Sequence, residues 1–348
     1  MTLSPKLLGL LGIHFWIAFG AAALLAYPIW RLLLLTKSRQ TISEYAPEGH
    51  QLKQGTPTMG GFIIVLAYLV AGVASMFISG PPGQDYFDRV KPAFLLLMAG
   101  FAVIGFVDDF VVPRLLKGKR GLGWKQKIIM QFGLAILGAG LCFGWKLDFD
   151  FTAAVFLILF FSNAYNFSDG LDGLAGTLLL GLVLGIAGIS LMTAWMEPVA
   201  VMIVPLAGAV IPFLYLNAPP AKVFMGDVGS LPIGAVLGLA VACLTLQPGW
   251  AQVDSVTTMP VSGSTGVILA CAILSVMMIV ELVPVPLQIA SVKLRKKKIF
   301  PYTPIHHAFE KAGWPETRVV WMFALTQLLL SLFAIFQLVV SSALPEVR

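Results

Sequence analysis

The chain has 348 residues, of which 58% are hydrophobic and only 11% are charged. A soluble domain carries charge on about 25% of its residues, so this composition excludes a soluble protein and requires the bilayer as solvent. The formal net charge of +6 does not indicate a nucleic-acid partner, because the lysines and arginines flank apolar stretches, where they orient a membrane protein.

Stretches of about 20 mainly apolar residues, the length that crosses a bilayer as a helix, occur ten times along the chain. The predicted fold is therefore all-α, with one polytopic transmembrane domain over residues 1–348 and about ten transmembrane helices. The first stretch exceeds the core of about 7–15 residues in a signal peptide, so we expect it to stay in the membrane. In chain order, the predicted helices are 10–35, 60–79, 92–107, 127–145, 151–166, 173–195, 198–216, 231–247, 264–289 and 319–342.

The basic residues predict an orientation for these helices. An even number of helices puts both termini on one side, and 18 of the 23 lysines and arginines then fall in loops on the opposite side. The positive-inside rule makes that opposite side cytoplasmic and both termini external. The unusual polar sequences lie on the same side, and we expect an active site formed by the cytoplasmic loops 36–59, 108–126, 167–172, 217–230 and 290–318.

Aspartates mark the cytoplasmic ends of two predicted helices. Asp108 and Asp109 end the third helix, and carboxylates at a membrane boundary are costly unless paired or hydrated, which favours a functional role over a polar helix terminus. Asp169 and Asp172 follow the fifth helix, each succeeded by a glycine that lets a ligand approach the backbone closely. Together with Asn166, these side chains can bind a cation or the edge of a nucleobase or ribose, and a capped loop is the alternative.

A further aspartate, Asp227, lies in the run Val223–Ser230 before the eighth helix. Gly226, Asp227, Gly229 and Ser230 suit a metal-binding carboxylate flanked by backbone donors at a helix start, where phosphate also binds. An ordinary Asp or Ser helix cap is the alternative. The carboxylates, glycine-rich turns and basic loops together indicate a Mg²⁺-dependent site for a phosphorylated substrate.

Two adjacent histidines, His306 and His307, lie in the last cytoplasmic loop within Pro304–Glu310. No cysteine or third histidine is nearby, so phosphate or carboxylate binding is favoured over zinc binding. Surface histidines on an interfacial helix are the alternative. Glu281 lies inside the ninth predicted helix, where we expect a charged residue to face a groove or the protein interior, and Pro284 just after it should kink that helix.

Five motifs, in this order, resemble the phospho-N-acetylmuramoyl-pentapeptide-transferase family of the polyprenyl-phosphate sugar-1-phosphate transferase superfamily. They are Gly55–Gly61, Asp108-Asp109, Asn163–Gly173, Val223–Ser230 and Pro304–Glu310. The family's members are the translocases that make lipid I, the first lipid intermediate of bacterial peptidoglycan. The resemblance implies a Mg²⁺-dependent phosphoglycosyl transferase of the bacterial cytoplasmic (inner) membrane. In its reaction, the phosphate of undecaprenyl phosphate attacks the sugar-linked phosphate of UDP-N-acetylmuramoyl-pentapeptide and releases UMP.

The resemblance also implies roles for individual residues. Asp227 would bind Mg²⁺, and Asp108 and Asp109 would position the lipid phosphate or the metal. His306 and His307 would contact phosphate or the donor sugar. A homodimer surrounded by membrane lipids is the implied assembly. The implied substrate-binding residues are Ser230 and a uridine pocket of Lys53, Thr58, Asn166, Asp169, Asp172, Asn217 and Phe224, with Phe224 stacking on the base.

Two positions depart from the family's pattern. Ala308 stands where a third consecutive histidine is usual, which questions an essential role for that third residue. The family often has a lysine soon after the two aspartates, whereas here Arg114 or Lys117 would supply the cation. The nearest rival is an enzyme that transfers another sugar phosphate, such as N-acetylglucosamine-1-phosphate. A transporter is the rival from another class, but its site would be expected near the membrane midplane.

Overall fold

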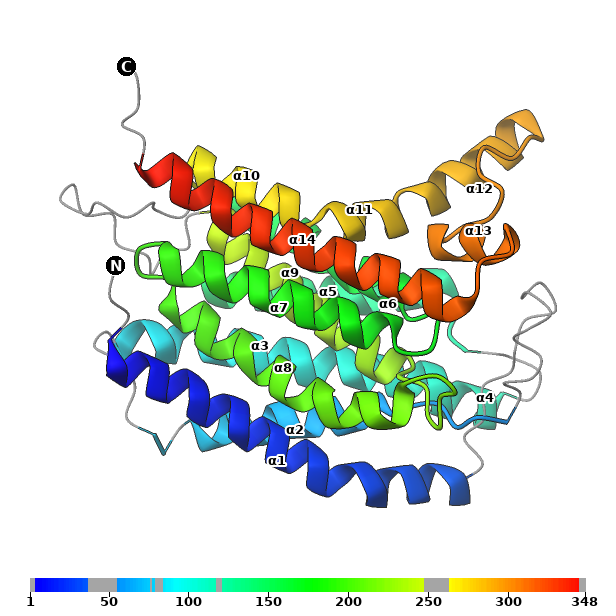
Figure 1. Cartoon of the computed structure of the whole chain (residues 1–348), viewed down its shortest axis with the longest axis horizontal. Coiled ribbons are helices and arrows are strands. Elements are labelled where there is room, and N and C mark those ends of the chain that lie inside the picture. Colours follow the sequence, from blue (N-terminus) through cyan, green and yellow to red (C-terminus); the bar gives the residue numbers. More distant parts are fainter. Residues whose placement is uncertain are drawn as a thin grey trace.

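The computed structural model describes residues 4–36, 55–75, 77–78, 84–116, 121–246 and 263–343. Within these residues the chain forms helices and no sheet, and most of the helices lie along one common direction as a bundle (Figure 1). In chain order the elements are α1 (Pro5–Leu35), α2 (Gly61–Ala74), α3 (Gln84–Phe106), the π-helical turn η2 (Val107–Val111), α4 (Val112–Leu115), α5 (Trp124–Phe143), α6 (Phe149–Ser168), α7 (Leu174–Met192), α8 (Glu197–Asn217), α9 (Asp227–Thr245), α10 (Thr265–Leu274), α11 (Val276–Leu282), α12 (Pro284–Arg295), α13 (Ile305–Lys311) and α14 (Glu316–Ala343).

Nine helical stretches among the described residues are long and apolar enough to cross a membrane. A further predicted helix, 60–79, corresponds to α2, which is apolar but has only 14 residues. The first turn of α1 and the last turn of α14 lie at the same end of the bundle (Figure 1), as expected for an even number of crossings. The prediction of an all-α polytopic membrane protein is therefore confirmed.

The predicted helix 264–289 is divided into three pieces. Helix α10 ends just before Ser275, whose hydroxyl donates to Cys271 O at 2.6 Å. Helix α11 ends at Leu282 and α12 begins at Pro284. Proline lacks a backbone N–H and its ring clashes with the preceding turn, so the predicted kink at Pro284 is confirmed. As a result, α12 diverges from α10 and α14 (Figure 1).

Helix α9 is the central element of the bundle. In its apolar window 94% of the residues are buried, compared with 28% in α1. A Cβ added at Gly234 would lie 2.4 Å from Phe161 O, and one at Gly238 would lie 2.5 Å from Leu157 O. Small residues permit such close helix crossings, so these glycines set the depth of α9 against α6. Asp227, the first residue of α9, is consequently surrounded by other helices at one end of the bundle.

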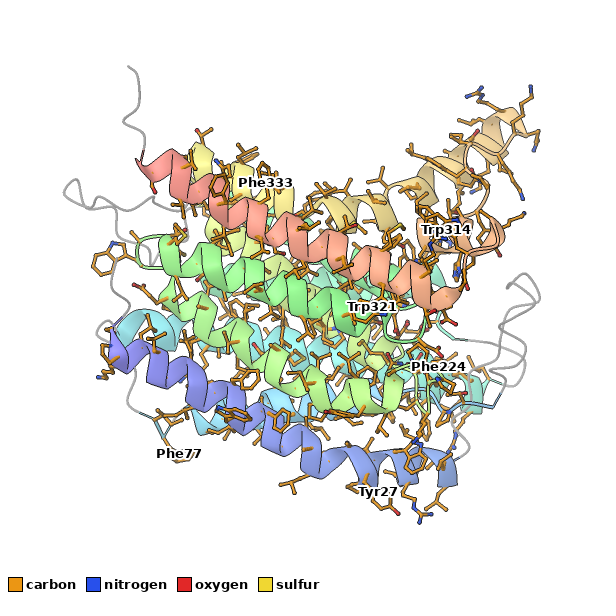
Figure 2. The ribbon with its side chains drawn as sticks, viewed as in Figure 1. Tyr27, Phe77, Phe224, Trp314, Trp321 and Phe333 are labelled. Carbon is orange, nitrogen blue, oxygen red and sulfur yellow. The ribbon has the colours of Figure 1, made fainter. Side chains whose placement is uncertain are left out.

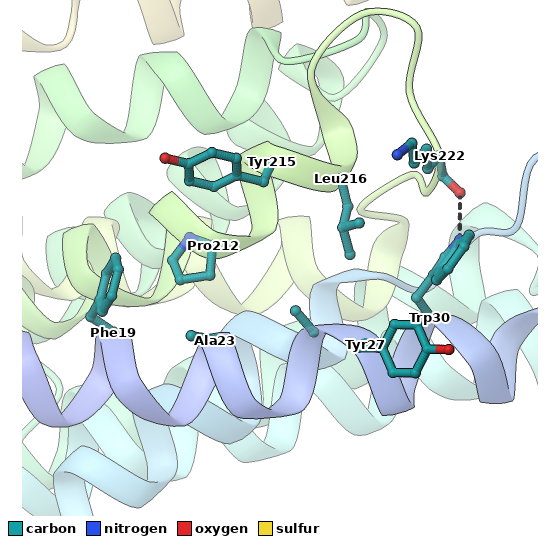
Figure 3. A pocket seen from close by; sticks show the side chains of 9 residues that line it. Phe19, Ala23, Tyr27, Trp30, Pro212, Tyr215, Leu216 and Lys222 are labelled. Carbon is teal, nitrogen blue, oxygen red and sulfur yellow. Dashed lines mark hydrogen bonds between the residues drawn. The ribbon is translucent and has the colours of Figure 1, made fainter.

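An apolar groove of about 420 Å³ lies between α1 and α8 (Figure 3). At one end of this groove, Nε1 of Trp30 donates to Lys222 O at 3.2 Å. The loop 218–226 that contains Lys222 also contains Phe224 and leads into α9, so this bond attaches α1 to that loop. Figure 2 shows Phe224 at the same end of the bundle as Trp314, which precedes α14.

Candidate active site

The segment that contains Thr58 lies beside the loop that precedes α9. Phe224 N donates to Pro57 O at 2.9 Å, and a Cβ added at Gly61 would lie 2.3 Å from Gly229 Cα. A side chain at either glycine would force the two segments apart. The glycines of two sequence motifs thus serve one backbone contact, and Thr58 is buried next to it.

Three carboxylates meet at this end of the bundle. Asp108 and Asp109 lie on η2, the π-helical turn that continues α3, and Asp227 is the first residue of α9. One ligand atom from each of the three lies within 4.8 Å of the other two. Asp109 Oδ2 also accepts from Val228 N at 3.3 Å. Single π-helical turns occur frequently at functional sites, and here the turn lets two adjacent aspartates face one neighbour.

This aspartate cluster, Asp108, Asp109 and Asp227, has the chemistry of a site for a hard cation. Mg²⁺ and Ca²⁺ prefer oxygen ligands, whereas zinc is held mainly by nitrogen and sulfur in most proteins. Among the residues that the structure describes, it is the one group of three or more potential metal ligands at this spacing. The donor set therefore fits the predicted Mg²⁺.

A lysine joins the aspartate cluster. Lys127, in the first turn of α5, forms an ion pair with Asp108 Oδ2 at 3.1 Å and another with Asp227 Oδ2. The other oxygen of Asp108 accepts from Leu122 N at 2.5 Å. Both oxygens of Asp108 are therefore held by donors of the segment 122–127, which fixes the carboxylate plane.

Lys127 was absent from the predicted site, and Arg114, one of the two cations predicted there, is engaged elsewhere. Arg114 donates to Thr36 O at 2.5 Å and lies over the ring of Phe110. Lys117 lies outside the described residues, as does Lys53 of the predicted uridine pocket. Lys127 is the first residue of a predicted transmembrane helix, where a lysine ordinarily anchors the helix end. The sequence alone therefore provided no reason to assign Lys127 to the site.

Two predicted substrate-binding residues support the cluster from the end of α6 and the residue that follows it. Asn166 Nδ2 donates to Asp227 Oδ1 at 2.7 Å and to Ser230 Oγ at 2.8 Å. Asp169 Oδ2 accepts from Gly226 N at 3.1 Å. Burial raises the pKa of the Asp169 carboxyl well above its usual range, the bond from Gly226 opposes this, and the nearby aspartates add to it. A bound cation would favour the ionised carboxylate.

Asp172 and Asn217 are each only 3% exposed and connect loops at the rim. Asp172 Oδ2 accepts from Ala221 N at 2.9 Å, and its own N–H donates to Glu316 Oε1 at 2.7 Å. Asn217 Nδ2 donates to Val223 O at 2.9 Å, and its Oδ1 accepts from the backbone directly after Asp172. These contacts join the loop after α6 to the loop before α9, which carries the half-buried Phe224.

His306 and His307 lie on α13, with their ring centroids 4.1 Å apart. Each Nδ1 bonds a carboxylate, which is Glu281 Oε2 at 2.7 Å for His306 and Glu310 Oε2 at 2.6 Å for His307. His306 and Glu281 are fully buried, so the alternative of a surface histidine is wrong for His306. The prediction that Glu281 faces the protein interior or a groove is confirmed.

Comparisons with a family model and with curated proteins both find transferases. A family model described as Glycosyl transferase family 4 matches residues 92–246, which include the whole aspartate cluster. The phospho-N-acetylmuramoyl-pentapeptide-transferase of Halalkalibacterium halodurans is 35% identical over 320 residues, covering 86% of this chain and 89% of that relative. The enzymes of the same name from Bacillus subtilis and Shouchella clausii are 33% and 34% identical, covering 86% and 92% of this chain and 89% and 95% of each relative.

These matches extend over nearly the full length of the chain and of its relatives. They agree with the five motifs that carried the resemblance and with the apolar helices of the fold. The chain is therefore a multi-pass bacterial membrane protein that belongs to the phospho-N-acetylmuramoyl-pentapeptide-transferase family.

Proposed function

We propose that this chain transfers phospho-N-acetylmuramoyl-pentapeptide from its UDP-linked donor to undecaprenyl phosphate. The products are lipid I, for peptidoglycan synthesis, and UMP. The observation that carries the proposal is the aspartate cluster with Lys127, which gathers at one point the charged groups that a phosphoryl transfer requires. The names of the relatives supply the donor.

Mg²⁺ is the proposed cofactor, and the aspartate cluster would hold it. When bound, the ion supplies positive charge to the phosphates of the donor. The chain's own residues supply orientation. Asn166 holds Asp227 through one oxygen, and Lys127, which already contacts two of the carboxylates, offers its ammonium group to a phosphate oxygen that enters the cluster.

Asp108 acts mainly by positioning the reactants. Its two oxygens are both engaged, with Leu122 N and with Lys127 Nζ. A phosphate monoester has a second pKa of about 6, so most of the lipid phosphate is already a dianion near neutral pH. Phosphoryl-transfer enzymes obtain most of their acceleration from positioning and charge stabilisation, which is what a carboxylate fixed in this way contributes.

The uridine of the donor lies against Phe224 in the proposed complex. An aromatic ring provides a stacking surface for a base, and Phe224 is half-buried beside the loop that leads to Asp227. Asn166 and Asp169 offer polar groups for the nucleotide, and Thr58 lies in the segment beside Phe224. The histidines of α13 would contact the donor's phosphate or sugar.

The proposed site faces the cytoplasm, and both termini face outward. The support is the distribution of basic residues, together with the position of the first turn of α1 and the last turn of α14 at the opposite end from α13 (Figure 1). An impermeant thiol reagent applied to intact cells should leave a Lys297→Cys variant unlabelled. The proposed assembly is a homodimer, which light scattering of the purified protein would measure.

One assay separates the proposed function from its rivals. Purified protein is given undecaprenyl phosphate, Mg²⁺ and either UDP-N-acetylmuramoyl-pentapeptide or UDP-N-acetylglucosamine, and UMP release is measured. We expect faster release from the muramoyl donor. Faster release from UDP-N-acetylglucosamine would assign the chain to the related transferases. No release from either donor, together with uptake that follows an ion gradient, would instead indicate a transporter.

A further inference from the structure

A buried carboxylate–histidine pair lies beside the proposed site. Glu281 on α11 and His306 on α13 are both 0% exposed, and Glu281 Oε2 lies 2.7 Å from His306 Nδ1. Desolvation of such a pair costs about as much as the pairing returns, and apolar side chains of similar size often give equal or greater stability. Stability alone therefore does not explain this pair.

The contact with Glu281 determines which ring nitrogen of His306 is available. An ionised carboxylate only accepts hydrogen bonds, so Nδ1 carries the proton in this contact. The other nitrogen, Nε2, is buried and has no hydrogen-bond partner. A Cβ added at Gly170 would lie 2.3 Å from this Nε2 atom. Glu281 thus turns the free nitrogen of His306 toward the backbone of the loop after α6.

That loop forms a wall of the proposed site. Asp169, next to Gly170, accepts a hydrogen bond from Gly226 N at 3.1 Å, one residue before Asp227 of the aspartate cluster. The second histidine approaches the same point, since a Cβ at Gly170 would also lie 3.3 Å from His307 Nε2. Two histidines, each with Nδ1 on a carboxylate, therefore direct Nε2 toward Gly170.

We propose that Glu281 is a positioning residue for the transfer reaction, which holds His306 so that its Nε2–H donates to a phosphate oxygen of the donor nucleotide. A ring with a proton on each nitrogen can donate to Glu281 and to a phosphate oxygen at the same time. Because Gly170 has no side chain, the His306 ring can lie directly against the backbone of the loop after α6. This inference rests on the proposed function, because it takes the donor's phosphate as the ligand.

The test compares substitutions at Glu281 with one at His306. In Glu281→Met the acceptor is lost while the size is kept, and we expect kcat/KM for UMP release to fall about 10²-fold, as for a misplaced reacting group. In Glu281→Gln the amide oxygen still accepts from Nδ1–H, and most of that loss should be recovered. Because Glu281 acts through His306, the Glu281→Met/His306→Ala double variant should be no slower than His306→Ala alone.

Two controls separate positioning from folding. The uridine affinity of each variant should equal that of the unchanged protein, since uridine lacks the phosphate that His306 is proposed to contact. The matched control is Glu197→Gln. Glu197 is a half-buried glutamate at the start of α8, and the other end of this helix, at Asn217, lies near the proposed site. This variant loses one charge and should retain full activity. Unchanged kcat/KM in Glu281→Met, or additive losses in the double variant, would overturn the inference.

A spectroscopic measurement tests the inference independently of turnover. The chain has 4 histidines, so ¹⁵N-histidine NMR can follow His306, with His306→Ala giving its assignment. We expect a proton on Nδ1 of His306 in the unchanged protein and a mixture of tautomers in Glu281→Met. If no donor releases UMP, the proposed function fails while the NMR result still decides whether Glu281 orients His306. An identical spectrum in Glu281→Met would refute the positioning role.

Discussion

The close contact between α3 and the start of α9 gives a sharp prediction. Gly105, on the last turn of α3, faces the backbone of Asp227. A Cβ added at Gly105 would lie 2.3 Å from Asp227 C and from Asp227 O, where ordinary contact begins at 3.4 Å. The substitution Gly105→Ala should therefore move the start of α9 by about 1.1 Å, the difference between these two distances.

The expected loss follows from that shift. Displacing a reacting group by about 1 Å can cost about 10²-fold in rate, and the shift separates Asp227 from Asp108 and Asp109 on η2. Without the contact, alanine in place of glycine within a helix would stabilise the fold by about 0.5–1 kcal/mol. The steric and the helix-propensity arguments thus predict opposite outcomes for the same substitution.

The assay measures kcat for UMP release at saturating donor and lipid, together with the midpoint of thermal unfolding. The matched control is Gly133→Ala in α5, where an added Cβ meets no atom within 4 Å. We expect Gly105→Ala to lose about 10²-fold in kcat and Gly133→Ala to keep the rate. Wild-type turnover in Gly105→Ala would refute the reasoning, and equal losses in both variants would show a general effect of alanine.

Three further substitutions test the site. Asp227→Asn should abolish turnover with the fold retained, since it removes one negative charge from the proposed Mg²⁺ ligands; near-normal activity would exclude Asp227 from the site. Phe224→Ala should weaken UMP binding, measured by calorimetry, by about 1–3 kcal/mol for a lost base–aromatic stack, and unchanged affinity would place the base elsewhere. Lys127→Gln should lower kcat but reduce the Mg²⁺ concentration for half-maximal activity several-fold, because one positive charge no longer competes for Asp108 and Asp227. A higher Mg²⁺ requirement would contradict that competition.

Much of the architecture follows from the sequence alone. In a bilayer the backbone must satisfy its own hydrogen bonds, so long apolar stretches predict helices and little else. Local chemistry predicted the kink at Pro284, and the cost of a charge at membrane depth predicted that Glu281 faces inward. Asp108 and Asp227 were assigned to one site because the positive-inside rule puts both in cytoplasmic loops, and the resemblance to a family supplied their individual roles.

The tertiary structure decided how the side chains combine. Lys127 and Asp227 are 100 residues apart, and whether a lysine at a helix end anchors lipid or enters a site depends on the rotation and depth of its helix. For α5 those variables are set by close contacts with α3, such as Gly138 against Leu97 and Gly100 against Leu134. The pairing of Glu281 with His306 likewise depends on how α11 packs against α13. Helix periodicity predicts a face of each helix, but only packing determines which faces meet.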